Sequence, residues 1–128
     1  MDFLGTKKLM GLRFERAAEV YLVDHGLEVL ERNFTCKVGE IDLILLEAGA
    51  AGRKPTLVFA EVRSRDPARS WEDPFASVGV KKRFRLRRAI EFYLWRRGPA
   101  FPRHFDQIRI DVLGTEGRGW EWRKGIEL

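Results

Sequence analysis

The sequence predicts an α/β fold in which one sheet carries helices packed against it. Two segments, residues 7–24 and 78–97, repeat apolar side chains at helical spacing, and shorter segments around them have the pattern of strands. The 128 residues are 45% hydrophobic and 34% charged, which suits one folded domain over residues 1–128. A leading helix, a run of strands, a second helix and further strands together predict a sheet covered by helices.

The N-terminal half is expected to contain one helix and three strands. The helix covers residues 7–24, and the glycine in "HGLEV", Gly26, ends it. The strands are "LEVLERNF" (27–34), "GEIDLILLE" (39–47) and "LVFAEVRSR" (57–65). Because the connections between them are short, an antiparallel meander is favoured.

The C-terminal half is expected to contain one helix and two strands. "DPARSWEDPFASVG" has two prolines and predicts a loop, which leads into a helix over about 78–97. The inward stripe of this helix is Leu86, Ala89, Ile90, Tyr93 and Leu94. The strands "QIRIDVLG" (107–114) and "GWEWRKGIEL" (119–128) follow it.

Charged side chains fall on faces that should be buried. Side chains alternate along a strand, so "VFAEVRSR" places Glu61 and Arg63 on the face of Phe59. The same alternation in "GEIDLILL" places Asp42 with Ile44 and Leu46, opposite the face that carries Ile41, Leu43 and Leu45. In the first helix, Glu15 lies on or beside the apolar stripe. Three carboxylates are thus expected to point inward.

A cluster of inward carboxylates has two interpretations. Ionised carboxylates are costly in apolar surroundings unless they pair with cations or hold a metal. Two carboxylates from neighbouring strands and one from a helix suit Mg²⁺, which prefers oxygen ligands and keeps several waters. Alternatively, Glu61 and Arg63 pair with other charges at the sheet edge, and Glu40 and Asp42 are solvated residues at the start of a strand.

Composition narrows the function classes. The only cysteine is Cys36, so an intrachain disulfide is excluded, and His25 and His104 offer little for a zinc site or a catalytic triad. No apolar run is long enough for a signal peptide or a membrane span, which leads us to expect a cytoplasmic protein with no membrane partner. Lys and Arg number 24 against 19 Asp and Glu, a bias that favours polyanionic partners.

The second helix carries most of the clustered positive charge. Its cations are Lys81, Lys82, Arg83, Arg85, Arg87, Arg88, Arg96 and Arg97, and Glu91 is its only acid. Such a helix can contact DNA phosphates without sequence preference, or it can be a solvated surface face. Lys82 precedes Leu86 by four residues, which turns it toward the inward acids. Trp120 and Trp122 can stack on bases, or they can pack in the core or at an interface.

Several motifs in order resemble a known family. "GEIDLI", "VFAEVRSR", "VGVKKRFRL" and "RIDVLG" are similar to the YraN-type family of small bacterial proteins, over about residues 11–128. That family resembles archaeal Holliday junction resolvases and the restriction-endonuclease-like PD-(D/E)xK superfamily. The resemblance implies a restriction-endonuclease-like core, with a mixed central β-sheet flanked by α-helices.

The resemblance also implies roles for individual residues. The leading-helix glutamate of the family falls on Glu15, the "GEID" acids on Glu40 and Asp42, and the "EVK" glutamate on Glu61. The family's later lysine falls on Lys82, and its Arg-x-Asp pair is matched by Arg109 and Asp111. In the related nucleases the equivalents of Asp42 and Glu61 bind catalytic Mg²⁺ or Mn²⁺.

Two positions depart from the family pattern. Phe14 replaces the glycine that commonly precedes the helix glutamate, and Arg63 replaces the lysine of "EVK". Lysine can orient or deprotonate the attacking water, whereas arginine stays protonated and supplies charge alone.

The expected function is therefore a metal-dependent DNA phosphodiesterase for branched or structured DNA. The expected catalytic residues are Asp42, Glu61, Arg63, Glu15 and Glu40, and the expected DNA contacts are Lys81, Lys82, Arg83, Arg85, Arg87 and Arg88. A symmetric homodimer would suit a resolvase-like reaction, since two opposed strands are cut. The competing expectations are a catalytically silent DNA-binding protein on a nuclease scaffold, and a basic scaffold that binds another protein.

Overall fold

A computed structural model describes residues 3–64, 79–98, 104–105, 107–115 and 118–128. The elements are α1 (Phe3–Asp24), β1 (Leu27–Cys36), β2 (Gly39–Glu47), β3 (Thr56–Ser64), α2 (Val80–Arg97), β4 (Gln107–Thr115) and β5 (Glu121–Arg123). The predicted loop over 66–77 lies outside the described residues. Neither helix of the described chain is long and apolar enough to cross a membrane.

The five strands form one mixed sheet in the order β1-β2-β3-β4-β5. The first three strands are antiparallel neighbours, which confirms the predicted meander. β3 and β4 are parallel, and β5 returns antiparallel to β4. A parallel pair requires a long crossover connection, and α2 lies within it. The α/β class with a mixed sheet is confirmed.

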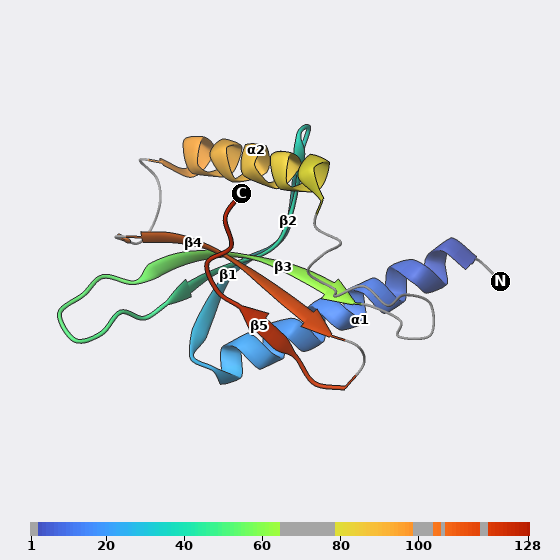
Figure 1. Ribbon diagram of the computed structural model, residues 1–128, viewed down its shortest axis with the longest axis horizontal. Helices are drawn as coiled ribbons and strands as arrows, with labels where there is room; N and C mark the ends of the chain where they lie inside the picture. The colour runs from blue at the N-terminus through green and yellow to red at the C-terminus, as the bar shows by residue number, and fades with distance from the viewer. Residues whose placement is uncertain (1–2, 65–78, 99–103, 106, 116–117) are drawn as a thin grey trace.

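The two helices cover opposite faces of the sheet (Figure 1). Under α2 the core consists of Ile41, Ile44, Leu46, Phe59, Leu57, Leu86, Ala89, Ile90 and Tyr93. Under α1 it consists of Ala18, Leu22, Leu27, Leu43, Leu45, Val58, Ala60 and Leu113. The predicted inward stripe of α2 is confirmed, and strand alternation correctly divides β3 between the two faces.

Ile41 is the exception to the alternation, since it packs under α2 and not with Leu43 and Leu45. The reason lies in the strand pairing. β2 pairs with β3 only as far as Leu43 opposite Ala60, whereas its pairing with β1 continues to Gly39. The end of the β1–β2 hairpin therefore leaves the sheet and rises beside α2 (Figure 1).

Gly39 allows this hairpin end to approach α2 closely. A Cβ atom at this position would lie 2.7 Å from the carbonyl oxygen of Arg85, closer than a real Cβ contact. A side chain of any size would push the hairpin away from the helix.

Glycines also limit the length of the last strand. β5 is shorter than the predicted 119–128, because Gly119 and Gly125 on either side of it have positive φ.

Candidate functional site

Asp42 lies where β2 and β3 separate. Beyond the pair of Leu43 and Ala60 no further backbone pairing joins the two strands. Instead, the Asp42 carboxylate accepts a hydrogen bond of 2.8 Å from the backbone N–H of Val62. The side chain thus replaces a strand partner. Asp42 and Glu61 line the same cavity of about 390 Å³, together with Glu40 and Gly39 from the hairpin end.

Glu61 is almost completely buried, with 4% of its surface exposed. Lys82, from the first turn of α2, places its Nζ 2.9 Å from Glu61 Oε1, which confirms that this lysine turns toward the acids. Arg63 lies on the same strand as Glu61, but its Nε is 4.0 Å from that oxygen. The nearer cation to Glu61 is therefore a lysine from the helix and not the arginine of "EVR".

The electrostatics of Asp42 differ from those of a surface aspartate. The pKa of Asp42 is raised to about 7, chiefly by burial and then by the negative charge of Glu61, while the hydrogen bond from the Val62 N–H opposes the change. Each effect has the sign expected from desolvation, like charge and hydrogen bonding to the ionised form. Ionised Asp42 is therefore disfavoured by its burial beside a second carboxylate, and a cation bound between the two would relieve this cost.

Glu15 approaches the same acids from α1. Burial raises its pKa, and so do the charges of Glu61 and Glu40, while a hydrogen bond with the Asn33 side chain lowers it. Glu40 is exposed at the start of β2. The structure thus brings all four predicted acids near one another. Glu40, Asp42 and Glu61 line the cavity, and Glu15 is close enough to interact electrostatically with Glu40 and Glu61.

Asn33 is a site residue that the sequence analysis did not identify. It lies in β1 between the pairs that Arg32 and Phe34 make with β2, and its φ is +51°. Asparagine tolerates this left-handed conformation better than most residues, and it is uncommon inside strands. An asparagine within the predicted strand 27–34, next to its last residue, was the available signal.

The donor set suits a hydrated hard cation better than a fully protein-bound one. Among the described residues no group of three or more His, Cys, Asp or Glu side chains is arranged to hold a metal. Asp42 and Glu61 nevertheless open into one cavity, and carboxylate oxygens are the ligands that Mg²⁺ prefers. Since Mg²⁺ is commonly held by one or two carboxylates with waters and substrate phosphates, these two residues fit it.

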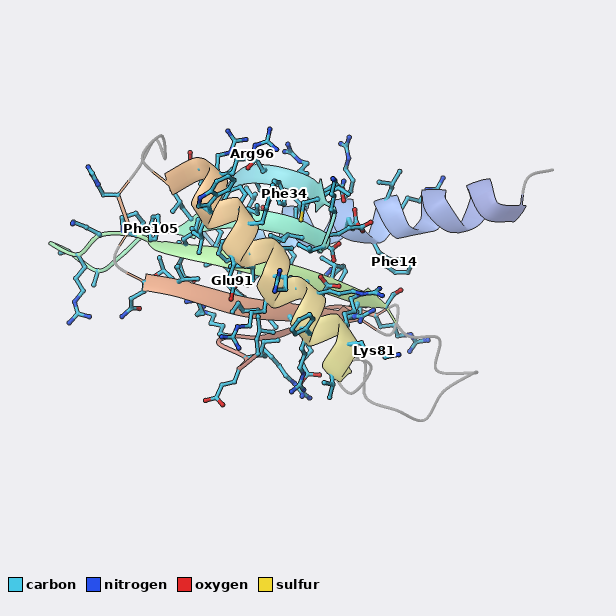
Figure 2. All side chains as sticks on the ribbon, turned by 90° about the horizontal axis from the view of Figure 1, so that it is seen from above. Phe14, Phe34, Lys81, Glu91, Arg96 and Phe105 are labelled. Atoms are coloured by element: carbon cyan, nitrogen blue, oxygen red, sulfur yellow. The ribbon has the colours of Figure 1, made fainter. Side chains whose placement is uncertain are left out.

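The basic residues of α2 extend from the cavity along the helix. Lys81, Lys82 and Arg85 line the cavity. Arg83, Arg87 and Arg88 are exposed further along, where Arg87 pairs with Glu91 at 3.3 Å. Seen from above, α2 lies across the strands, with Lys81 at one end and Arg96 near the other (Figure 2). The predicted DNA contacts therefore form an exposed surface that begins at the acids.

Arg109 and Asp111 lie elsewhere. Asp111 is fully buried in β4, where it accepts hydrogen bonds from Arg109, from the indole N–H of Trp122 and from the backbone of Gly125. Neither residue lines the cavity. Trp122 is partly buried against the core under α1, as is Trp120, which favours packing over base stacking for this pair.

The fold and the cavity define a small mixed α/β protein with an acidic pocket beside a basic helix. The chain belongs to the family described as Uncharacterised protein family UPF0102, whose model matches residues 14–114. The match confirms the YraN-type resemblance and includes every residue of the acidic pocket.

Similar proteins come from several bacteria. The UPF0102 protein of Alcanivorax borkumensis is 42% identical over 117 residues, which are 91% of this chain and 85% of that protein. The UPF0102 protein of Burkholderia thailandensis is 38% identical over 92% of this chain and 74% of its own length. That of Janthinobacterium sp. is 42% identical over 83% of this chain and 80% of its own length.

Proposed function

We propose that the protein is a metal-dependent DNA phosphodiesterase with a restriction-endonuclease-like core, acting on branched or otherwise structured DNA. One observation carries this proposal. Asp42 and Glu61, which lie on two separating strands, line one side of a cavity. The cationic first turns of α2 line the other side. Acids that can hold a metal thus lie next to cations that can hold a phosphate.

The acids divide into two groups by position. Asp42 and Glu61 would hold Mg²⁺ or Mn²⁺, which when bound would activate a water and offset the charge of the phosphate. Glu40, which lines the cavity and is exposed, and Glu15, which interacts with Glu40 and Glu61 from α1, would hold waters around this site. Asn33 would keep Glu15 in position through its side-chain hydrogen bond.

Two cations share the role that the motif lysine has in related enzymes. Arg63 remains charged and cannot act as a base, so it supplies electrostatic stabilisation alone. The Lys82 ammonium already lies 2.9 Å from Glu61, within the distance at which it can orient a water or a phosphate oxygen. We assign the lysine chemistry of the motif to Lys82.

The rest of α2 would bind the DNA backbone. Lys81, Arg83, Arg85, Arg87 and Arg88 are exposed on this helix, and phosphate contacts of this kind give affinity without sequence preference. Because such binding releases counterions, its affinity should fall steeply as salt increases. A symmetric dimer would present two such helices to a branched substrate.

A second candidate function is DNA binding without cleavage. The ion pair of Lys82 with Glu61 favours it, since the lysine neutralises the carboxylate that a metal would require. Arg63 in place of the motif lysine favours it too. In this case the protein would bind structured DNA as a partner in repair or uptake.

Metal-dependent cleavage separates the two functions. The purified protein is incubated with labelled single-stranded, duplex, flap and four-way DNA in Mg²⁺, Mn²⁺ or EDTA. We expect cleavage of the branched substrates with either metal and none in EDTA. Glu61→Gln should abolish cleavage and retain DNA binding, whereas the matched change Glu91→Gln, on the exposed side of α2, should retain both.

Metal binding gives a readout that does not depend on activity. Mg²⁺ should raise the melting temperature of the parent protein, because a ligand that binds only the folded state stabilises it. The same addition of Mg²⁺ should leave the melting temperature of the Glu61→Gln variant unchanged. Binding of all four DNAs without cleavage and without a thermal shift would support the second candidate function.

A further inference from the structure

A second groove lies on α2 beside the acidic pocket. Its volume is about 590 Å³, and α2 forms one wall with Val80, Lys81, Phe84, Arg85 and Arg88. The other wall is Lys37 and Val38, at the turn between β1 and β2. The roles proposed above account for the cations that α2 contributes to this groove, but not for Lys37 or for the aromatic ring of Phe84.

Phe84 is the aromatic residue of the groove lining, and it is not part of the core. Its exposed fraction is 61%, whereas the buried residues of the same helix are Leu86, Ala89, Ile90 and Tyr93. Val80, Phe84 and Arg88 follow one another at four-residue intervals and share a face of the helix. Arg88 Cζ lies 5.9 Å from the centroid of the Phe84 ring. An apolar ring is thus presented to solvent among cations.

The walls of the groove are held in place by the backbone. Gly39, directly after the turn, lies so close to Arg85 that a Cβ atom would be 2.7 Å from its carbonyl oxygen. The turn and the helix are therefore packed directly against each other beside the groove. Walls that pack against each other lose less conformational entropy on binding a ligand than separate mobile segments do.

The charge of the groove identifies the chemistry of its ligand. Lys37, Lys81, Arg85 and Arg88 contribute four positive charges, and no acid is present in its described lining. A polyanion is therefore favoured, and a ring among cations suits a partner that has both phosphates and flat apolar faces. Single-stranded nucleic acid has both, because its bases are free to stack on aromatic side chains.

The groove and the acidic pocket are continuous. Lys81 and Arg85 line both of them. A phosphate held between these two cations would belong to a strand that reaches the pocket on one side and Phe84 on the other. Lys81 and Arg85 thus connect the groove to the pocket, and one DNA strand could contact both sites through them.

We propose that this groove binds an unstacked nucleotide of a single-stranded DNA segment, with its base on the Phe84 ring and its phosphates on Lys81 and Arg85. The inference rests on the proposed function in one respect, namely that the adjoining pocket is where such a strand would be cut. It makes DNA with a single-stranded branch or flap the preferred substrate class, since duplex DNA offers no free base face.

Binding in EDTA tests the groove independently of cleavage. Fluorescence anisotropy is measured with the full chain and labelled oligonucleotides of about 20 nucleotides, single-stranded or duplex. Phe84→Ala should weaken single-strand binding about tenfold and duplex binding less than about twofold. Phe84→Tyr should bind single strands as the parent does, because the ring is retained.

Trp95 provides the matched control. It is an exposed aromatic residue on the same helix, with 78% of its surface accessible, and it lies outside the groove. Trp95→Ala should leave both affinities unchanged. An equal loss for Phe84→Ala and Trp95→Ala, an equal loss for single-stranded and duplex DNA, or no loss with Phe84→Ala would each overturn the proposal.

Stacking has a spectroscopic signature of its own. A 2-aminopurine base in the single strand should become brighter when the parent protein binds it, because the base leaves its neighbours in the strand, and this increase should disappear in Phe84→Ala. An unchanged increase in that variant would also overturn the proposal. If the parent protein shows these binding results but never cleaves DNA in Mg²⁺ or Mn²⁺, the proposed enzymatic function fails and the groove remains.

Discussion

Two aspartates, Asp42 and Asp111, lie in strands of the same sheet and have opposite surroundings. Asp111 is fully buried and accepts two hydrogen bonds from Arg109, one from Trp122 and one from the backbone of Gly125. For Asp42 the structure gives one backbone hydrogen bond, from Val62, and places it beside the like charge of Glu61. The charge of Asp111 is thus fully compensated, whereas that of Asp42 is compensated only in part.

The difference identifies which acid has a structural role. Arg109 joins Asp111 to Glu47, so that one guanidinium connects β4 to the end of β2. In the pocket, Lys82 pairs with Glu61, and Asp42 keeps a pKa raised to about 7 by burial. An acid whose charge the fold does not balance lowers stability, and such positions are typical of binding and catalytic sites. An acid that is fully hydrogen-bonded holds strands together.

The largest expected effect on stability belongs to the compensated aspartate. Asp111→Ala leaves the indole N–H of Trp122 without its acceptor and the part-buried Arg109 with Glu47 as its remaining partner. Removing one partner of such a buried network costs about 3–5 kcal/mol of the free energy of unfolding. Urea denaturation of the variant measures this loss.

The neighbouring ion pair of Glu121 and Arg123 is the control for that measurement. Both side chains are exposed, by 63% and 43%, and their closest atoms are 3.4 Å apart. Glu121→Ala should change the free energy of unfolding by less than about 0.5 kcal/mol. Equal losses in the two variants would show that burial and hydrogen bonding do not distinguish Asp111.

The next effect concerns the cations of the pocket. If Lys82 supplies the lysine chemistry, Lys82→Ala should lower the rate of DNA cleavage about 100-fold, by analogy with the loss of one charge-stabilising donor. Arg63→Ala should lower the rate less, because Arg63 Nε is 4.0 Å from Glu61, against 2.9 Å for Lys82 Nζ. Single-turnover rates at saturating protein measure both. A larger loss of rate in Arg63→Ala than in Lys82→Ala would show that Arg63, and not Lys82, has the role of the motif lysine.

Asp42→Asn should stabilise the protein, in contrast to the loss at Asp111. The pKa of Asp42 is about 7 in the folded state and lies near 4 in an unfolded chain. Between these values the folded state binds the extra proton, so the aspartate destabilises the fold increasingly as pH rises from about 4 to about 7. Asparagine carries no charge and can still accept the Val62 hydrogen bond.

The expected gain for Asp42→Asn is roughly 2 kcal/mol at pH 8 and much less at about pH 5, in metal-free buffer with EDTA. Urea denaturation at the two pH values measures it. A gain that is the same at both pH values would show that ionisation of Asp42 is not its cause. A loss at pH 8 would show that the pocket does compensate this charge.

Local patterns in the sequence predicted most of the fold. The strand 39–47 has the predicted bounds, and helical spacing identified the buried stripe that includes Leu86 and Tyr93. The parallel pairing of β3 with β4 was not predicted, because it joins segments on either side of α2 and depends on tertiary packing. The departure of β2 from β3 after Leu43 was missed for the same reason, and with it the position of Ile41.

The candidate site was predicted where a single strand or helix determines the face of a side chain. Alternation placed Asp42 and Glu61, and helical spacing placed Lys82, at the cavity that they line. Asn33 and Phe84 were missed, because their surroundings depend on how the β1–β2 hairpin meets other elements. Local patterns could not predict the hydrogen-bond partners of Asp111 either, because Trp122 reaches Asp111 only through the pairing of β4 with β5.

The smallest effect is expected at Glu47, the second partner of Arg109. Hydrogen bonds from Arg109 hold the pKa of Glu47 below its usual value. A lowered folded pKa contributes stability above the unfolded value of about 4.3, and this contribution disappears as pH falls below it. Glu47→Gln should cost about 1 kcal/mol at pH 7, since Arg109 keeps Asp111, and close to nothing at about pH 3. Urea denaturation at both pH values measures the difference. A cost at pH 7 as large as that of Asp111→Ala would show that Glu47 anchors the guanidinium as strongly as Asp111 does.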